Sequence, residues 1–192
     1  MKKIFFLSAL AILLWFTTAM AGVGPYVGIG PTYVDITSAA DPYFDTIDPA
    51  LGLELRFGYN FGPMALEGNF IGSTHHDSFP GFSHGDFTGW SFDLRIFLFP
   101  LPQPNQLYLL FGVGGYTFSQ TDNFTGNHYE LSGPGFNLGM GFEHYFNQHV
   151  SIDVRGVYRF IDYNLDINGF TVDTNVNGDT FTLGVALNFH FY

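Results

Sequence analysis

The sequence predicts an all-β protein, an eight-stranded antiparallel up-and-down transmembrane β-barrel with short periplasmic turns and four long external loops. Three observations predict this fold. Apolar and polar residues alternate along eight segments, short and long connections alternate between the segments, and the charges within the segments avoid the apolar positions. A period of two is typical of a β-strand, because successive side chains point to opposite faces.

The last segment, "FTLGVALNFHFY", shows the alternation most clearly, since Phe181, Leu183, Val185 and Leu187 share one parity. It is longer than the usual five or six residues of a strand and suits a tilted strand that crosses a bilayer. Seven earlier segments have the same pattern. In chain order the predicted strands are centred on 27–33, 51–59, 64–70, 90–98, 107–113, 136–142, 150–160 and 181–192.

The connections between these segments fall into two groups. Three are short, around Gly62-Pro63, at "PLPQPNQ" and at "NQH", whereas the gaps at about 35–50, 73–86, 119–132 and 161–179 are long and polar. Short turns at one end and long loops at the other are typical of a membrane barrel. Pro31 has no backbone donor, so we expect a bulge or the fraying end of the first strand there.

Charged residues within the strands lie on the parity opposite to the apolar residues. Because a charge on the lipid face costs roughly 2 to 4 kcal/mol at the bilayer midplane, the apolar parity is predicted to face lipid and the charged parity the lumen. An inward hydrogen-bonded ion-pair network is therefore expected. Its members are Glu54, Arg56, Glu67, Asp93, Arg95, Glu143, Asp153, Arg155 and Arg159.

The first 21 residues are typical of a cleaved signal peptide. Lys2 and Lys3 precede an apolar run, and Ala19-Met20-Ala21 fits a signal-peptidase site, so cleavage after Ala21 and a single domain over 22–192 are expected.

The rest of the chain holds four arginines against 17 acidic residues, which makes nucleic acid an implausible partner. The chain has no cysteine, which excludes a disulfide scaffold and a thiol nucleophile.

Several segments carry a resemblance to a known family. "GPYVGIGPTYVD", "LYLLFGVGGYTFS", "FNLGMGFEHYF", "VSIDVRGVYRF" and "LGVALNFHFY" resemble the OmpA/OmpX-like eight-stranded outer-membrane β-barrel family. The resemblance implies integral insertion in the outer membrane of a Gram-negative bacterium, with outer-membrane lipid and lipopolysaccharide as surroundings. It also implies that the last strand is read by the outer-membrane assembly machinery, through Phe189, Phe191 and Tyr192.

An eight-stranded barrel has a lumen just wide enough for side chains to fill. The sequence therefore favours a structural or surface-interaction protein with a plugged lumen and acidic external loops. A narrow channel for small or apolar solutes is the alternative, because many inward positions are glycine; these glycines either let aromatic side chains fold over them or leave a cavity. The acidic loops are expected to attract cations, and the external ligand, if there is one, is not identified by the sequence.

No cofactor, catalytic residue or metal site is assigned. "DTNVNGD" at 173–179 copies half of a calcium loop but lacks the closing glutamate, and its Asn177-Gly178 is expected to mark a turn or bulge. His75, His76, Asp77, Ser78, His84 and Asp86 could hold zinc or form a Ser/His/Asp hydrolase site, but they are read as scattered loop residues. A lipid A-modifying enzyme is the third function considered. Its His-x-Ser pattern occurs at His149-Val150-Ser151, which is predicted to lie at a periplasmic turn, so the chain is expected not to be an enzyme.

Overall fold

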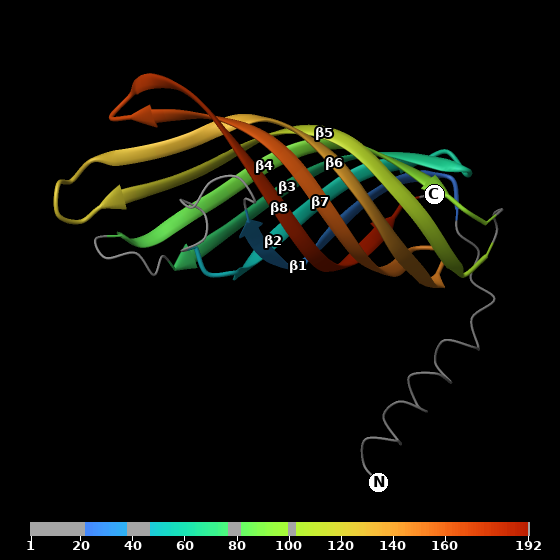
Figure 1. Cartoon of the computed structure of the whole chain (residues 1–192). Coiled ribbons are helices and arrows are strands. Elements are labelled where there is room, and N and C mark those ends of the chain that lie inside the picture. Colours follow the sequence, from blue (N-terminus) through green and yellow to red (C-terminus); the bar gives the residue numbers. More distant parts are fainter. Residues whose placement is uncertain (1–21, 38–46, 77–81, 100–102, 192) are drawn as a thin grey trace, which may run out of the picture.

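The computed structural model describes residues 22–37, 47–76, 82–99 and 103–191, and within them the protein is built from eight β-strands (Figure 1). No helix among these residues is long and apolar enough to cross a membrane. The strands are β1 (Gly24–Thr37), β2 (Ala50–Asn60), β3 (Met64–His76), β4 (Phe82–Phe97), β5 (Asn105–Asp122), β6 (His128–Asn147), β7 (Val150–Ile167) and β8 (Phe170–His190).

The strands form a closed antiparallel barrel in which each strand pairs with its neighbours in sequence. Closure comes from β1, whose Val27 lies opposite Phe57 of β2 on one side and Phe189 of β8 on the other. Closing the sheet satisfies the backbone groups of the wall within the protein, which hydrocarbon surroundings require. The predicted fold class is therefore confirmed.

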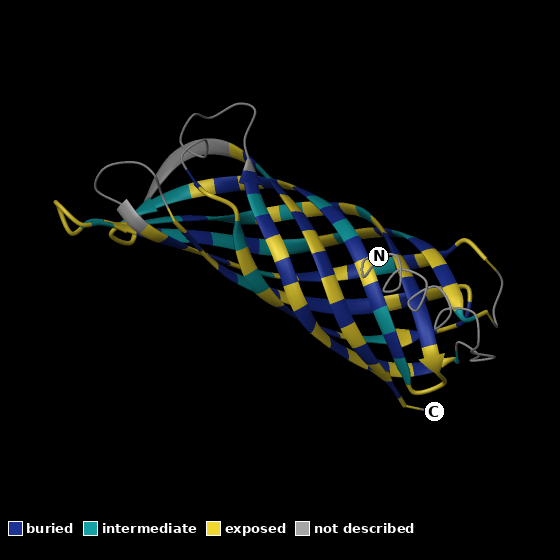
Figure 2. Ribbon diagram, turned by 90° about the horizontal axis from the view of Figure 1, so that it is seen from below, coloured by how far each residue is buried: buried dark blue, intermediate teal, exposed yellow. Residues whose placement is uncertain are grey.

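Burial alternates along the strands, but apolar side chains are exposed and charged side chains are buried, the reverse of a soluble protein. Large apolar side chains such as Leu55, Phe92 and Leu187 are 46%, 62% and 44% exposed, while Arg56 and Asp153 are 2% and 0% exposed. Figure 2 shows the result as buried and exposed residues that alternate along the strands of the wall. The apolar parity forms the outer face and the charged parity the lumen, as the sequence predicts.

The outer apolar face is tall enough to cross a bilayer. It runs from Trp90 on β4 to Leu98, the residue after that strand, a distance of about 26 Å at roughly 3.3 Å per residue. With a strand tilt of about 40° this gives about 20 Å along the membrane normal, close to the roughly 25 Å apolar band of such barrels once side chains are included. Thr88 and Asp86 follow Trp90 on the same face, so the apolar belt ends between Trp90 and Thr88.

The strand ends that border the long polar segments lie at one end of the barrel, as predicted, but two of these segments, 119–132 and 161–179, are mostly strand and not loop. β5 and β6 are joined by residues 123–127, and β7 and β8 by Asn168-Gly169 alone, so both hairpins extend past the rest of the wall (Figure 1). Asn168 and Gly169 have φ values of 53° and 82°. Two residues with positive φ give a tight hairpin turn whose twist matches the strands, which lets β7 and β8 stay paired up to the turn.

The strand register corrects two predictions about irregular positions in the strands. A turn or bulge was expected at Asn177-Gly178, but both residues are regularly paired, with Asp162 and Ile161. The register shift lies earlier in β8, because Asn164 pairs with Asn175 whereas Leu165 pairs with Val172. Pro31 causes no bulge and no strand end, since β1 keeps the same register with β8 before and after it and continues to Thr37. The missing donor of Pro31 affects only the β8 side, and its pairing with β2 is uninterrupted.

Candidate functional site

The centre of the lumen holds an ion-paired network of seven charged residues. Their side chains are at most 3% exposed, and they come from β2, β3, β4, β6 and β7. Three arginines bridge four carboxylates. The seven members, hereafter the lumen network, are Glu54, Arg56, Glu67, Arg95, Glu143, Asp153 and Arg155.

Each arginine of the lumen network contacts at least two carboxylates from different strands. Arg56 pairs with Glu54 at 2.5 Å and with Asp153. Arg95 contacts Glu143 at 2.7 Å, Asp153 at 3.1 Å and Glu67 at 3.4 Å.

Arg155 completes the lumen network by pairing with both Glu54 and Glu67. The planar guanidinium presents several fixed N–H donors, which is why one arginine can hold two carboxylates in a defined geometry. The three arginines therefore link the strands across the lumen in addition to the backbone pairing of neighbouring strands.

Asp93 and Arg159 lie in the same lumen but outside this set of ion pairs. Asp93 accepts hydrogen bonds from Ser91 and Asn137, each at 2.8 Å. Arg159 donates to Thr182 at 2.6 Å and lies 5.7 Å from the centre of the Tyr116 ring. No carboxylate of the described residues lies within ion-pair distance of Arg159, so the structure brings seven of the nine predicted charges together and leaves two with neutral partners.

Several neutral inward residues complete the lumen network and were not singled out as site residues from the sequence. Tyr26 donates to Glu67 at 2.7 Å and Tyr108 to Asp153 at 2.8 Å, while the Arg95 guanidinium stacks 3.9 Å from the centre of the Tyr108 ring. Their signal in the sequence is the inward parity combined with a polar tip. That signal shows that a residue faces the lumen but does not show which carboxylate it meets.

A second group of neutral residues surrounds Glu143 near the end of the short turns. Ser151 donates to Glu143 at 2.5 Å and Asn188 donates to it at 2.8 Å. His190 Nε2 lies 2.9 Å from the Ser151 hydroxyl and 3.4 Å from Glu143. The serine of the predicted His-x-Ser pattern is thus fully buried and meets His190, while the His149 ring lies 3.2 Å from the backbone oxygen of His190 and 3.1 Å from the Gln148 amide.

Aromatic side chains fold over several of the inward glycines, which is the first of the two interpretations of those glycines. A Cβ added to Gly135 would lie 2.9 Å from the Tyr116 ring, and a Cβ added to Gly114 would lie 2.7 Å from the Tyr116 hydroxyl. The Tyr26 ring covers Gly58 in the same way, with 2.6 Å between a ring carbon and a Cβ built there. These glycines make room for rings, so the space they provide is occupied.

An apolar layer fills the lumen between the lumen network and the end with the long hairpins. Its side chains are at most 6% exposed and come from β1, β3, β4, β5, β6 and β7, together with Ile47, three residues before β2 begins. This layer, hereafter the upper plug, contains Val34, Ile36, Ile47, Ile71, Phe87, Tyr116, Phe118, Leu131, Ile161 and Tyr163. This layer was not predicted from the sequence, because toward the long hairpins the inward-facing residues become apolar instead of charged.

The rim at the end of the long hairpins is acidic and well ordered in places. Asp122 accepts hydrogen bonds from the Thr125 hydroxyl at 2.6 Å and the Phe124 amide at 2.8 Å, and these donors lower the pKa of Asp122. The β7–β8 turn docks on the neighbouring hairpin, since Asn168 donates to Asn127 at 2.9 Å. The two hairpins therefore support each other at their tips.

The motifs considered for metal binding do not form a site in the described part of the chain. His75 is buried and bonded to Ser73, and the exposed rings of His76 and His84 lie 4.7 Å apart, whereas Asp77 and Ser78 fall outside the described residues. The segment 173–179 is extended strand in β8 and does not wrap as a calcium loop would. No group of three potential ligands occurs among the described residues.

The predicted assembly signal lies on the outer face. Phe189 and Phe191 are 43% and 54% exposed on the lipid-facing parity, and Tyr192 lies outside the described residues. The residue between the two phenylalanines, His190, points into the lumen and is 3% exposed. Both phenylalanines are therefore placed where another protein or lipid can contact them.

Comparison with known proteins gives the same fold. Residues 7–189 match the family model described as the outer membrane protein β-barrel domain. The structure is similar to OprG from Pseudomonas aeruginosa (19% identity, TM-score 0.67, covering 91% of this chain and 98% of that chain). It is also similar to Neisserial surface protein A (16% identity, TM-score 0.65, covering 88% of this chain and 99% of that chain). A third similar structure is Ail, the attachment invasion locus protein of Yersinia pestis (16% identity, TM-score 0.57, covering 90% of this chain and 100% of that chain).

No curated protein matches the sequence significantly. At identities below 20%, the similarity to the solved structures establishes a shared fold. The family model, in contrast, covers most of the chain, and the closed eight-stranded barrel with an apolar outer face agrees with it. The chain belongs to the outer membrane protein β-barrel domain family and is an integral protein of the outer membrane.

Proposed function

We propose that this protein is a closed barrel without conducting or catalytic activity, whose role is to present the acidic rim of its long hairpins to cationic partners at the cell surface. The observation that carries the proposal is the filled lumen. The lumen network and the upper plug lie one above the other across the barrel, and both consist of side chains that are nearly inaccessible to solvent. The surfaces left for other molecules are the rim and the outer wall.

The rim has the charge that such a role requires. Its described acidic residues are exposed or half-buried, and no lysine or arginine follows Arg159 in the sequence or lies in the other long segments. A rim of one sign attracts counter-charged partners over about 8 Å at physiological salt and over about 30 Å at 0.01 M salt. The described rim acids are Asp35, Asp48, Asp86, Asp122, Glu130, Asp162, Asp166 and Asp179.

The arrangement around His190 supports a role other than hydrolysis. In a serine hydrolase the histidine contacts serine through one ring nitrogen and the acid through the other. Here Ser151 and Glu143 both approach Nε2 of His190, and Ser151 is 0% exposed. A substrate therefore has no access to the hydroxyl.

A narrow path through the lumen is the second candidate function. It is favoured by a few buried polar atoms that have no hydrogen-bond partner among the described residues, including Asn69 Oδ1, Gln106 Oε1 and Arg159 Nε. Buried water commonly occupies such positions. A conducting path would therefore consist of a single file of water molecules that passes these atoms.

Planar-bilayer recording combined with a binding assay tests the proposal. Refolded protein is expected to give no discrete openings, whereas steady openings that change when Arg95 or Arg155 is replaced would establish the channel instead. In vesicles, a fluorescent decalysine peptide should bind at 0.01 M salt and be released at 1 M salt. Replacing Asp122, Asp162 and Asp166 by asparagine should weaken that binding, and Ser119→Ala in the same hairpins is the uncharged control.

Unchanged peptide binding after the three replacements would refute the rim role. Binding that persists at 1 M salt would refute it as well, because a purely electrostatic attraction between exposed charges is screened within about 3 Å at that concentration.

A further inference from the structure

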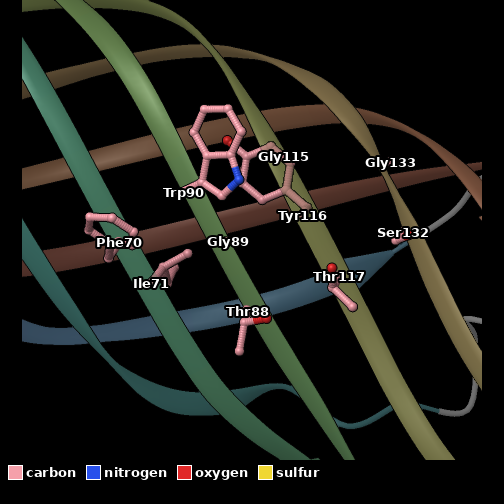
Figure 3. Close-up of a pocket in the computed structure, with 10 residues that line it drawn as sticks. All are labelled: Phe70, Ile71, Thr88, Gly89, Trp90, Gly115, Tyr116, Thr117, Ser132 and Gly133. Atoms are coloured by element: carbon pink, nitrogen blue, oxygen red, sulfur yellow. The ribbon is translucent and has the colours of Figure 1, made fainter.

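The outer wall carries a hollow that neither the fold nor the proposed rim role explains. It has a volume of about 570 Å³ and lies across β3, β4, β5 and β6 (Figure 3). Its outward-facing lining residues are Phe70, Thr88, Trp90, Gly115, Thr117 and Ser132. The inward-pointing neighbours Ile71, Gly89, Tyr116 and Gly133 complete the lining.

The hollow exists because the outer face of β5 carries a glycine, Gly115, between the side chains of Val113 and Thr117. Gly115 is half-buried and lies opposite Trp90 of β4. A Cβ added to Gly115 would lie 2.9 Å from Nε1 of Trp90, so the indole leans over the glycine and forms one wall of the hollow. Figure 3 shows Trp90 near Gly115, with Phe70 on the adjacent strand.

A row of three hydroxyl side chains borders the hollow on the side of the long hairpins. Thr88 pairs with Thr117 across β4 and β5, and Thr117 pairs with Ser132 across β5 and β6. Directly paired residues have Cβ atoms about 5 Å apart, so the row spans about 10 Å. None of the three hydroxyls has a hydrogen-bond partner among the described residues.

The hollow thus straddles the boundary of the apolar belt. Phe70 and Trp90 belong to the belt, being 51% and 49% exposed, while the hydroxyl row lies just beyond it. Tryptophan is enriched at this depth of a membrane protein. Hydroxyl groups without partners at the edge of hydrocarbon are costly unless a neighbouring molecule accepts their hydrogen bonds.

We propose that this hollow binds one acyl chain of the lipid A anchor of lipopolysaccharide. The chain would lie along Phe70, Trp90 and Gly115, and the hydroxyl row would donate to the oxygen atoms at the start of the chain. The acyl chains linked to the sugars of lipid A carry an ester or amide carbonyl and an oxygen substituent two carbons further on. These oxygens offer several acceptors within the reach of the row, whereas an acyl chain of a glycerophospholipid has a single ester carbonyl.

The position of the hollow favours lipid A over other lipids, while the charge beside it sets a requirement for a cation. The hollow lies on the half of the wall next to the long hairpins, which in an outer-membrane barrel is the half in the lipopolysaccharide leaflet. Asp86 and Glu130 are the next outward residues beyond Thr88 and Ser132. The phosphates of a lipid held here therefore require a divalent cation between them and these carboxylates.

The test uses Trp90 as an internal probe. The chain has two tryptophans, Trp15 and Trp90, so Trp15→Phe leaves Trp90 as the only indole. This protein is refolded in dodecyl maltoside with magnesium and titrated with lipid A and, separately, with phosphatidylethanolamine. Lipid A should change the Trp90 emission saturably, with one lipid bound per protein by native mass spectrometry, at concentrations at least tenfold lower than phosphatidylethanolamine.

Two variants locate the site. Gly115→Leu fills the hollow and should weaken lipid A binding at least tenfold. Gly156→Leu is the matched control, because Gly156 faces outward on β7, away from the hollow, and a Cβ there meets only the Phe181 ring at 3.7 Å. Its lipid A affinity should stay within twofold of the parent.

The outcomes that overturn the proposal are distinct from those for the rim role. Equal affinity for the two lipids, no saturation, or equal loss in the two glycine variants would each overturn it. Should Gly115→Leu fail to refold, the double variant Thr88→Val and Thr117→Val keeps the side-chain volumes and removes two donors. It should bind lipid A about tenfold more weakly, and unchanged binding would overturn the proposal. Peptide binding at the rim is unaffected in every case.

Discussion

Arg155 is the residue whose replacement tests the lumen network most directly. Its guanidinium pairs with Glu54 from β2 and Glu67 from β3, and all three side chains are at most 3% exposed. Arg155→Met removes both ion pairs and keeps much of the side-chain volume. Glu54 then retains Arg56, and Glu67 retains Arg95 and Tyr26, so neither carboxylate is left without a partner.

The expected loss follows from these contacts. Two hydrogen bonds between charged groups contribute about 1.5 to 3 kcal/mol each, and breaking a buried pair by removing one partner costs about 3 to 5 kcal/mol. Because the two carboxylates keep their other partners, we expect the free energy of unfolding to fall by about 4 kcal/mol. Urea unfolding from phospholipid vesicles, followed by Trp90 fluorescence in the Trp15→Phe background, measures this change.

Arg159→Met is the matched control for the same assay. Arg159 is as deeply buried as Arg155, but it donates to Thr182 and has no ion pair with the described carboxylates. Its replacement removes one hydrogen bond and also removes a charge whose burial is costly, so the expected loss is below about 2 kcal/mol. If Arg159→Met destabilised the barrel as much as Arg155→Met, specific pairing would not be the source of the stability.

Three further outcomes are expected. Phe118→Ala should lower the free energy of unfolding by about 3 to 5 kcal/mol, since Phe118 is 1% exposed in the upper plug; a loss below 1 kcal/mol in the urea assay would contradict a packed layer. Gly169→Val places a β-branched residue at a φ of 82° and should speed amide hydrogen exchange in the β7–β8 hairpin while the barrel wall stays protected. The ionised carboxylate of Asp122 holds its turn at pH values above its ordinary pKa of about 4. Hydrogen bonds from Thr125 and the Phe124 amide lower the pKa of Asp122 in the folded state, so the turn should loosen as the pH falls through this lowered pKa. Hydrogen exchange at Phe124 across that range, with Asp122→Asn as the pH-independent control, measures it.

The sequence predicted the wall of the barrel well because hydrocarbon imposes a strict rule on every strand residue. A single step along a strand exchanges the lipid face for the lumen, so the positions of Asp93, Arg95, Asp153 and Arg155 were enough to assign both faces. The eight alternating segments predicted the strand number, and the alternation of short and long connections predicted the end that carries the long segments. These features depend on local pattern alone.

Strand ends in the hairpins were less predictable. Outside the membrane the periodic pattern weakens, and residues 161–179 were expected to form a loop although Asn168-Gly169 is a strong two-residue turn signal. The turn lets β7 and β8 remain paired, and the bulge falls opposite Asn164 instead of at Asn177-Gly178. Polar composition alone does not distinguish a paired hairpin from a loop at the membrane surface.

The sequence by itself determined that the charged residues face inward and the apolar residues face lipid, because the two solvents differ so strongly in their tolerance of charge. Only the tertiary structure decided which groups meet. Arg155 reaches Glu54 and Glu67, whereas Arg159, four residues further along β7, meets Thr182. The shear of the closed barrel determines which residues of different strands lie at the same height in the lumen. The upper plug and the hollow beside Gly115 also depend on side chains from several strands, which no single strand pattern contains.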